Sequence, residues 1–477
     1  MGGHGMRRLL PLVVCAATAH CGGGTDSPLP EVAFRGGAVM AHPALVPIFF
    51  AGDPDVEALT QFSHWIVASK WLGSVGSEYG VGVGSVLGTV QRSDPAPSSI
   101  SDRQIIDLVF AGLADGSFPK PANGDLRDVL YMLQFPQQTA ITAGSSTSCI
   151  DFGGYHSSAR RNGVEVAYAV IATCPGFVDG YDDLAIRQLV SSHELIEAAT
   201  DPIPDNRPGF QIDDPVSSWL ALGEEVADLC NRADSTAVWS ENGFVAQRSW
   251  SNAAAAAGDD PCVPGQQKPF FTAVAKLSTA PRIPPGGHQA IELTGWFTGS
   301  KDLFSWPLEV NSDQPADVSF AFSDAALKPQ STTTLNVTIS PSAPRGELIR
   351  FFVFSDGQDS YQVLPMYAVV GDECSSFTSC TSCSAQLGCG FCASNGACQP
   401  IGDSSCSPSA FAIWPGSCDG FCASHGVTCA SCAALPGCGW CGSGGGQCLE
   451  ASHDGGGPAH ASCAYADWSA TSSYCGP

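Results

Sequence analysis

The cysteines of the C-terminal region restrict the folds open to this chain more than any other feature. They form two successive sets of eight with similar spacing. The first set is Cys374, Cys380, Cys383, Cys389, Cys392, Cys398, Cys406 and Cys418, and the second is Cys422, Cys429, Cys432, Cys438, Cys441, Cys448, Cys463 and Cys475. Short segments this rich in cysteine are usually held together by disulfides or by a metal. The spacing predicts an internal repeat of two small modules, over residues 374–418 and 422–475.

A short motif recurs in both modules, GCGFC at Gly388–Cys392 and GCGWC at Gly437–Cys441, and Trp414 and Trp468 precede the closing cysteines. With these motifs the region resembles the PSI module of plexins, semaphorins and integrins, which implies a small disulfide-rich fold. A zinc ribbon is the alternative, because its ligands also occur as Cys-x-x-Cys pairs. The even number of cysteines per module in a secreted chain favours disulfides.

The N-terminus has the pattern of a secretory signal. Arg7-Arg8 precedes an apolar run from Leu9 to Ala17 that is too short to span a bilayer. We therefore expect a signal peptide over residues 1–20 and a protein that is secreted or held at the outer cell surface.

Cys21 is the candidate for a lipid anchor, because its Gly-rich surroundings resemble a bacterial lipoprotein tether, here residues 21–31. Removal of Cys15 with the signal and lipidation of Cys21 leave an even set of 20 cysteines out of 22. Cleavage after Ala19, the alternative, leaves one cysteine over. Contact with a membrane is expected only through this anchor.

The charge of the chain excludes some partners. With 46 acidic and 21 basic residues, its formal net charge is -25. Such an excess argues against binding to nucleic acid or to anionic lipid.

Residues 32–265 alternate strand-like and helix-like patterns, which indicates a mixed α/β (α+β) domain. Buried strands are expected at Val46–Phe50, Val129–Leu133 and Val164–Ala172. Amphipathic helices are expected over 55–72 and over 101–113, the second capped by Ser101.

Residues 268–371 change to short alternating runs separated by turn residues. About a hundred residues of this kind predict an all-β immunoglobulin-like or fibronectin-like sandwich. The complete chain is therefore expected to be a multidomain protein.

One helix carries the candidate chemistry. It is expected to begin near Asp182 and to end at Asp201-Pro202, because the residue before a proline is disfavoured in the α region. His193 and Glu197 are four residues apart and share one helix face, so both can bind one metal ion. Glu194 lies beside them as a candidate general base. Catalytic zinc needs a third protein ligand and an open position for water.

This helix resembles the HExxH helix of zincin metallopeptidases, with Glu197 in place of the second histidine. By the same resemblance, gluzincins imply Glu225 as the third ligand and Asp228 as the residue that orients His193. Asp228 is an equal alternative as ligand. His156 is a further candidate, with a structural loop role as its alternative, and Tyr155 or His156 is a candidate to assist the reacting oxygen.

A wider set of motifs occurs in one order: Cys149, Gly154–Ser157, Cys174-Pro175-Gly176, the His193 helix and Glu225–Cys230. Over residues 35 to 265 this order is similar to that of phosphate-induced, EXORDIUM-like secreted proteins. The resemblance implies a shared site, and peptidase activity follows from the HExxE-type helix.

The remaining cysteines most simply pair as Cys149 with Cys174 and Cys230 with Cys262, although sequence alone does not fix the connectivity. Aspartates after the helix leave two interpretations open, a solvated loop or a Ca²⁺ site in place of Zn²⁺. They are Asp201, Asp205, Asp213 and Asp214, with Glu224 nearby.

Two functions follow from these patterns. The first is a secreted or surface-tethered zincin-like metallopeptidase that cleaves a peptide or protein substrate, with Glu194 as base and His193 and Glu197 as ligands. The second is a non-catalytic adhesion protein that binds a surface protein or glycan through its C-terminal modules. In that case the helix binds a structural metal or none. Two simpler alternatives to a metal site are that His193 is bonded to a nearby carboxylate without metal and that Glu194 and Glu197 form a solvated helix face.

Overall fold

The computed structural model describes residues 29–475 except 205–206, 213–216, 232–236, 266–268, 276, 278, 280, 299–304, 358–360, 402, 404, 407–410, 414, 419, 436, 452–456, 459–460, 465–466 and 472–474. The expected signal peptide, the lipidation of Cys21 and the position of Trp414 lie outside the described residues.

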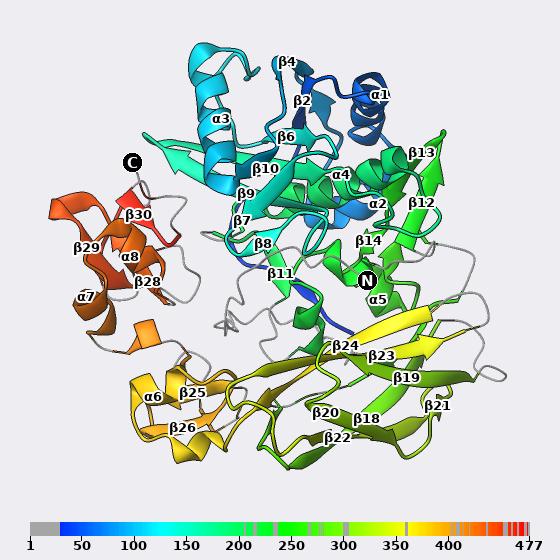
Figure 1. Ribbon diagram of the computed structural model, residues 1–477, viewed down its shortest axis with the longest axis vertical. Helices are drawn as coiled ribbons and strands as arrows, with labels where there is room; N and C mark the ends of the chain where they lie inside the picture. Colours follow the sequence, from blue (N-terminus) through cyan, green and yellow to red (C-terminus); the bar gives the residue numbers. More distant parts are fainter. Residues whose placement is uncertain are drawn as a thin grey trace.

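The N-terminal half is built on a six-stranded mixed sheet (Figure 1). Three parallel strands form its centre, namely β2 (Ala44–Ala51), β6 (Val129–Phe135) and β10 (Val164–Ala172). β9 (Gly154–Arg161) pairs antiparallel with β10 and forms one edge. At the other edge β3 (Ser85–Val86) and β4 (Val90–Pro95) both pair with β2.

Helices cover both faces of this sheet. In β2, Val46 and Ile48 belong to the core under α3 (Asp102–Asp115), whereas Leu45 belongs to the core shared with α1 (Val56–Ile66), α2 (Lys70–Gly76) and α4 (Asp183–Thr200). Successive strand residues point to opposite faces, so fully apolar strands require cover on both sides. The expected mixed α/β region is therefore confirmed, as a three-layer arrangement.

Local capping decides where two of these helices begin. Ser101 and Gln104 form the capping box of α3, as the sequence predicted at Ser101. The single helix expected over 55–72 is wrong, because the structure has two. Ser69 interrupts it: its hydroxyl accepts a hydrogen bond from the Leu72 amide and caps α2.

α4 lies between the sheet and the hairpin of β12 (Val238–Glu241) and β13 (Phe244–Gln247). The Asp182 carboxylate caps its N-terminus through the Ala185 amide at 2.8 Å. Arg187 fixes the first half of α4, since its guanidinium pairs with Asp53 at 2.7 Å and with Asp55 at 3.1 Å.

Short elements complete this region. They are β1 (Val32–Phe34), η1 (Ser77–Tyr79), β5 (Ser99–Ser101), β7 (Ala140–Ala143), β8 (Ser146–Thr147), β11 (Phe210–Ile212), η2 (Ser218–Ala221), η3 (Asp228–Cys230), β14 (Ser249–Trp250), α5 (Asn252–Ala257) and β15 (Cys262–Val263). The structure pairs Cys149 with Cys174 and Cys230 with Cys262. The first disulfide ties the loop before β9 to the loop after β10, and the second ties η3 to β15.

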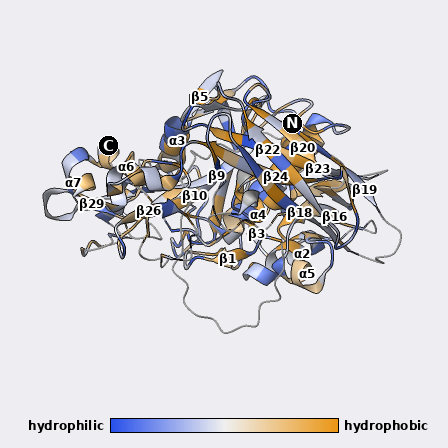
Figure 2. Cartoon of the chain, turned by 90° about the horizontal axis from the view of Figure 1, so that it is seen from below, coloured by the Kyte–Doolittle hydropathy of each residue, from blue (hydrophilic) through white to orange (hydrophobic). Residues whose placement is uncertain are grey.

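The expected β-sandwich is confirmed by strand pairing. Its sheets have the orders β16-β18-β22-β20 and β17-β24-β23-β19-β21. The strands are β16 (Phe271–Val274), β17 (Arg282–Ile283), β18 (His288–Phe297), β19 (Trp306–Ser312), β20 (Val318–Phe322), β21 (Ala326–Leu327), β22 (Thr332–Ile339), β23 (Leu348–Asp356) and β24 (Tyr361–Val370). Hydrophobic residues recur along these strands (Figure 2). One continuous apolar core joins the sandwich to the α/β region, with η2 against β24.

The sixteen C-terminal cysteines form eight disulfides, so the zinc-ribbon alternative is wrong. In the first module the pairs are Cys374–Cys389, Cys380–Cys418, Cys383–Cys398 and Cys392–Cys406. In the second they are Cys422–Cys438, Cys429–Cys475, Cys432–Cys448 and Cys441–Cys463. Numbered within each set, both modules pair the first cysteine with the fourth, the second with the eighth, the third with the sixth and the fifth with the seventh.

Each module has short helices packed on a three-stranded sheet. The first contains η5 (Cys374–Ser376), α6 (Cys380–Ser384), β25 (Cys389–Cys392), β26 (Ala397–Pro400), β27 (Phe411–Ala412) and η7 (Pro415–Ser417). The second contains α7 (Phe421–His425), α8 (Cys429–Ala433), β28 (Cys438–Cys441), η8 (Ser443–Gly445), β29 (Gln447–Glu450) and β30 (Trp468–Ser469).

Both modules contact the rest of the chain. Tyr367 of the sandwich shares a hydrophobic cluster with Ile401 and Phe411 of the first module. The second module lies beside β9 (Figure 1), where the Arg160 guanidinium donates a hydrogen bond to the Trp468 carbonyl.

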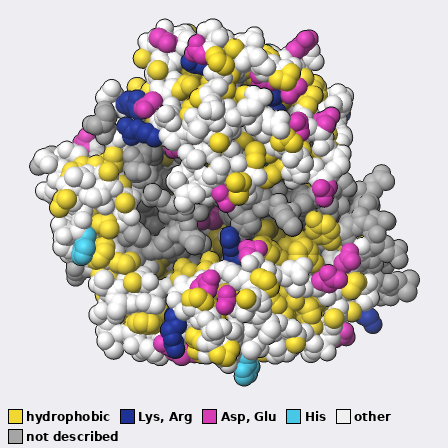
Figure 3. Space-filling view, in the orientation of Figure 1, with side chains coloured by type: hydrophobic (Ala, Val, Ile, Leu, Met, Phe, Trp, Pro, Cys, Tyr) yellow, Lys and Arg dark blue, Asp and Glu magenta, His cyan; other side chains and the backbone are white. Residues whose placement is uncertain are grey.

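The ten disulfides indicate an extracellular protein. Among the described residues, no helix has the length and apolar character needed to cross a membrane. On the face seen in Figure 3, Asp and Glu side chains are scattered over the described surface, and Lys and Arg form only small groups.

Candidate functional site

The second half of α4 brings His193, Glu194 and Glu197 into the interior. Their side chains are 12%, 5% and 4% exposed. The interpretation of Glu194 and Glu197 as a solvated helix face is therefore wrong. Carboxylates buried to this degree need cations, protons or hydrogen-bond donors as partners.

His193 and two carboxylates converge on one point. His193 Nε2 lies 3.1 Å from Glu197 Oε2 and 3.6 Å from Asp228 Oδ1. The Asp228 amide also donates to Glu197 Oε1 at 3.1 Å, which fixes the start of η3 against α4. Gly223 leaves room for this arrangement, because a Cβ atom there would lie 1.7 Å from Asp228 Oδ2.

Gln247, at the end of β13, determines which nitrogen of His193 faces the carboxylates. The Gln247 side-chain amide donates to the Ala227 carbonyl at 2.8 Å, so its oxygen is the atom that lies 3.0 Å from His193 Nδ1. Nδ1 is then the protonated nitrogen of neutral His193, and the lone pair of Nε2 points at Glu197 and Asp228. Three acceptors that meet in this way need a cation or a proton between them.

We expect Gln247→Leu to weaken metal binding at His193 about 10–100-fold, because histidine ligands depend on such outer partners for their orientation. Competition of the purified protein with a chelating dye measures the change. Gln61→Leu, on the exposed face of α1, is the matched control. Equal affinities in the two variants would contradict the role of Gln247.

His156 lies on β9 and faces α4 from the sheet. Its Nδ1 is 3.5 Å from Glu194 Oε2 and 3.7 Å from Glu197 Oε2. Its Nε2 is 3.1 Å from the Asp201 carbonyl and 3.5 Å from Glu225 Oε1. His156 is only 8% exposed, so it is part of the interior cluster and not of a surface loop.

Glycines at the start of β9 allow this approach. A Cβ atom on Gly154 would lie 2.5 Å from Val190 Cγ1 and 3.0 Å from Glu194 Oε1, and one on Gly153 would lie 2.9 Å from the Phe177 ring. The Gly-Gly-Tyr-His sequence is therefore what lets α4 and β9 pack closely enough for Glu194 to reach His156.

The structure brings every predicted metal ligand and the predicted base into one cluster, which contains His156, His193, Glu194, Glu197, Glu225 and Asp228. Asp228 is the downstream carboxylate that lies against His193, whereas Glu225 lies against His156. The resemblance to gluzincins implied Glu225 as the ligand and Asp228 as the residue that orients His193. These positions do not match, since Gln247 is the residue that lies against Nδ1 of His193 and orients it.

The carboxylates change the proton affinities of both histidines. Burial lowers the pKa of His193, but Glu197, with smaller contributions from Glu194 and Asp228, outweighs burial and the pKa is well above its usual value. Burial likewise lowers the pKa of His156, and Glu225 and Glu194 reverse the effect. The pKa of Glu194 is raised by its burial. The cluster therefore attracts positive charge.

Two expectations about nearby residues are corrected. Tyr155 does not assist at the cluster, because it points to the opposite face of the sheet and donates to Asp102 at 2.7 Å.

The Asp201 carboxylate accepts hydrogen bonds from the Gly209 amide and the Gln211 side chain, both at 2.8 Å, and so stabilises the turn that ends α4. The other aspartates of the Ca²⁺ alternative, Asp205, Asp213 and Asp214, lie outside the described residues.

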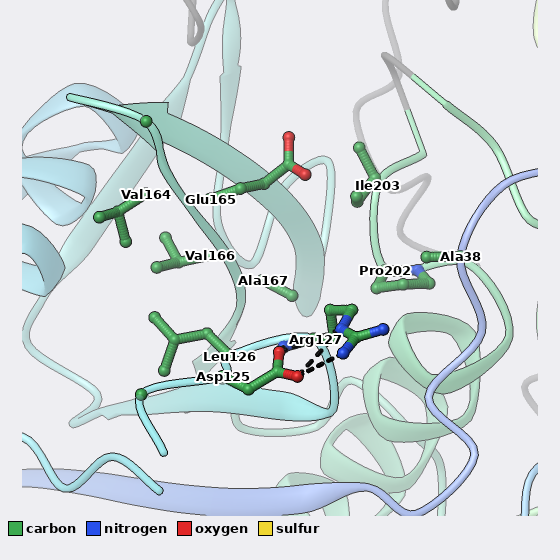
Figure 4. A pocket seen from close by; sticks show the side chains of 12 residues that line it. Ala38, Asp125, Leu126, Arg127, Val164, Glu165, Val166, Ala167, Pro202 and Ile203 are labelled. Carbon is green, nitrogen blue, oxygen red and sulfur yellow. Dashed lines mark hydrogen bonds and ion pairs between the residues drawn. The ribbon is translucent and has the colours of Figure 1, made fainter. Parts of the chain in front are cut away.

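A cavity of about 300 Å³ lies away from the cluster (Figure 4). Asp125 and Arg127, which form an ion pair of 2.5 Å, line it together with the start of β10 and with Pro202 and Ile203. None of the candidate metal ligands lines this cavity.

Comparison with known proteins does not place the chain in a family. No protein-family model and no curated protein match the sequence. Solved structures match about a fifth of it. SSP-19, an MSP-domain protein like family member in Caenorhabditis elegans, is 11% identical over 20% of this chain and 94% of its own, with a TM-score of 0.15. WR4, a C. elegans MSP family member, is 11% identical over 21% and 97%, with a TM-score of 0.16. Titin M4 is 11% identical over 22% and 93%, with a TM-score of 0.14.

Proposed function

We propose that this chain is an extracellular metal-dependent hydrolase of the zincin-like class, acting on peptide or protein substrates. One observation carries the proposal. Gln247 sets the tautomer of His193, so that its Nε2 lone pair points at Glu197 and Asp228 in a largely buried site.

The donor set fits a zinc-type ion. Ligand atoms about 2.0–2.1 Å from a tetrahedral ion are roughly 3.3 Å apart, and His193 Nε2 lies 3.1 Å from Glu197 Oε2 and 3.6 Å from Asp228 Oδ1. Calcium fits less well, because it takes six to eight oxygen ligands, whereas one of the ligand atoms here is an imidazole nitrogen. An ion held by two carboxylates is a weaker Lewis acid than one held by two histidines. Carboxylate ligands also favour a harder cation among the divalent first-row transition metals.

A divalent ion bound here would supply Lewis-acid activation of water and of a scissile carbonyl. The protein residues supply the rest. Glu194 is the carboxylate next to the ligands and accepts the proton of the attacking water, and burial raises its pKa and therefore its affinity for that proton. Gln247 keeps His193 in the ligand tautomer, and the burial of the cluster excludes bulk water.

The remaining domains fit a protein that acts outside the cell. The EXORDIUM-like order of motifs over residues 35 to 265 and the PSI-like modules support a secreted hydrolase whose C-terminal part holds it at a surface. We include the lipid anchor at Cys21 in this proposal.

Removal of metal tests the proposal. We expect a chelator to abolish cleavage of casein or of a peptide library by the full mature chain, because the proposed mechanism needs the ion. Zn²⁺ or Mn²⁺ is expected to restore cleavage, because the convergent acceptors repel one another without a cation and therefore bind a new one. Products are identified by mass spectrometry. Cleavage that survives complete removal of metal would disprove a metal-dependent mechanism.

One observation favours a second function, a non-catalytic binding protein with a structural ion. The Glu194 side chain is only 5% exposed and lies against His156, which leaves a substrate little access to it, and the cavity of about 300 Å³ beside Asp125 and Arg127 lies elsewhere. A chain that holds metal, gains thermal stability from it and cleaves no peptide would support this alternative.

A further inference from the structure

We propose that the cluster holds a second divalent cation, bound by His156, Glu194 and Glu197, so that Glu197 is shared between two ions. This inference goes beyond the proposed function, on which it rests through the shared Glu197, and it makes Glu194 a metal ligand in place of the general base. His156 Nδ1 and the Oε2 atoms of Glu194 and Glu197 supply the new site.

The tautomer of His156 supports a ligand role. A backbone carbonyl can only accept, so the 3.1 Å contact with the Asp201 carbonyl requires the proton on Nε2. Neutral His156 then presents the lone pair of Nδ1 to Glu194 and Glu197. Each histidine of the cluster therefore has one nitrogen hydrogen-bonded to a neutral acceptor, Gln247 or the Asp201 carbonyl, and the other directed at carboxylates. Nε2 of His156 also lies 3.5 Å from Glu225 Oε1.

Both directed nitrogens point at the same atom. Glu197 Oε2 lies 3.1 Å from His193 Nε2 and 3.7 Å from His156 Nδ1. One carboxylate between two sets of ligands is the arrangement of two-metal hydrolase sites, where the ions are about 3.5–4 Å apart. The helix places Glu197 one turn after His193, and β9 supplies His156 from the other side.

The charges of the cluster also call for more than one ion. Glu194, Glu197, Glu225 and Asp228 carry four negative charges when ionised, and their side chains are 5%, 4%, 2% and 19% exposed. With both histidines neutral, one divalent ion leaves a net charge of about -2, and two leave none. Buried charge is costly unless it is balanced, which favours the second ion.

The backbone around His156 is built for a close approach. Gly153 and Gly154 let α4 pack onto β9, and the Cys149–Cys174 disulfide holds the loop before β9 to the loop after β10. One imidazole with carboxylates suits Zn²⁺ and also harder ions such as Mn²⁺.

Metal stoichiometry tests the second ion. The full mature chain is stripped of metal, reloaded with Zn²⁺ or Mn²⁺, dialysed and measured by mass spectrometry. We expect about two ions per chain in the wild type and about one in His156→Gln and in Glu194→Gln, in line with a two-metal site. His193→Gln is also expected to keep about one. His64→Gln, on the exposed face of α1, is the matched control and keeps the wild-type content.

The outcomes separate this inference from the proposed function. One ion that is lost in His193→Gln but kept in His156→Gln and Glu194→Gln overturns the second site and leaves the proposed function standing. One ion lost in His156→Gln and kept in His193→Gln overturns the His193 site as well as the pair. No bound ion overturns both, and two protonated histidines then offset two of the four negative charges.

A second measurement does not depend on the folding of any variant. In the Mn²⁺-loaded wild type, two ions that share Glu197 give the electron paramagnetic resonance spectrum of an exchange-coupled pair. A spectrum of isolated Mn²⁺ alone, at full loading, would overturn the shared site.

Discussion

Glu194→Gln is expected to lower peptide hydrolysis by about 10²–10⁴-fold, the usual contribution of a general acid–base group. Gln has nearly the same shape as Glu, so the 4% exposed position on α4 stays filled. It cannot accept the proton of the attacking water. If Glu194 instead holds the second ion, the same substitution removes a charged ligand, and hydrolysis falls for that reason. Initial rates on a fluorogenic peptide, once one is found by library screening, measure the loss.

Glu309→Gln is the matched control for Glu194→Gln, because Glu309 is exposed on β19 of the sandwich, and its rate is expected to equal that of the wild type. Thermal unfolding of both variants separates loss of chemistry from loss of fold. A Glu194→Gln variant with undiminished cleavage would exclude this residue from the reaction.

The parts of the fold that the sequence predicted are those specified by local or repeated signals. The helix expected from near Asp182 to Asp201-Pro202 is observed at Asp183–Thr200. Its ends were predictable because the Asp182 cap and Pro202 each act on the helical turn next to them. The repeat in cysteine spacing predicted two modules, and each has the same disulfide connectivity. The apolar runs predicted the buried strands for the same reason, since a strand covered on both faces is apolar throughout.

The residues that the sequence did not reveal act through contacts between distant segments. Gln247 lies 54 residues from His193, and no motif surrounds it. The division of roles between Asp228 and Glu225 depends on the path of the chain after Gly223, which spacing does not specify. Tyr155 illustrates the same limit, because its neighbour His156 faces the cluster, and the alternation of β9 turns Tyr155 the other way.

Arg187→Met is expected to destabilise the protein by about 3–5 kcal/mol, the usual cost of removing one partner from a buried ion pair. The side chains of Arg187 and Asp53 are 1% and 0% exposed, and the guanidinium also donates to Gln134. Without Arg187, the Asp53 carboxylate remains buried and keeps the hydrogen bond from the Asp55 amide, but it loses its cation. Chemical denaturation, followed by tryptophan fluorescence, measures the loss.

A double variant and a surface control identify the cause of this loss. Arg187→Met combined with Asp53→Asn should unfold at higher denaturant than Arg187→Met alone, because the uncompensated charge is gone and the Asp55 amide keeps an acceptor. Arg161→Met breaks the exposed pair with Asp107 and should cost less than about 1 kcal/mol. If the double variant is no more stable than the single one, lost packing around Arg187 explains the effect, and the ion pair is not what secures α4. If stability returns, the pair anchors the end of α4 opposite to His193, and the positions of the candidate metal ligands on α4 depend on a contact made six residues before His193.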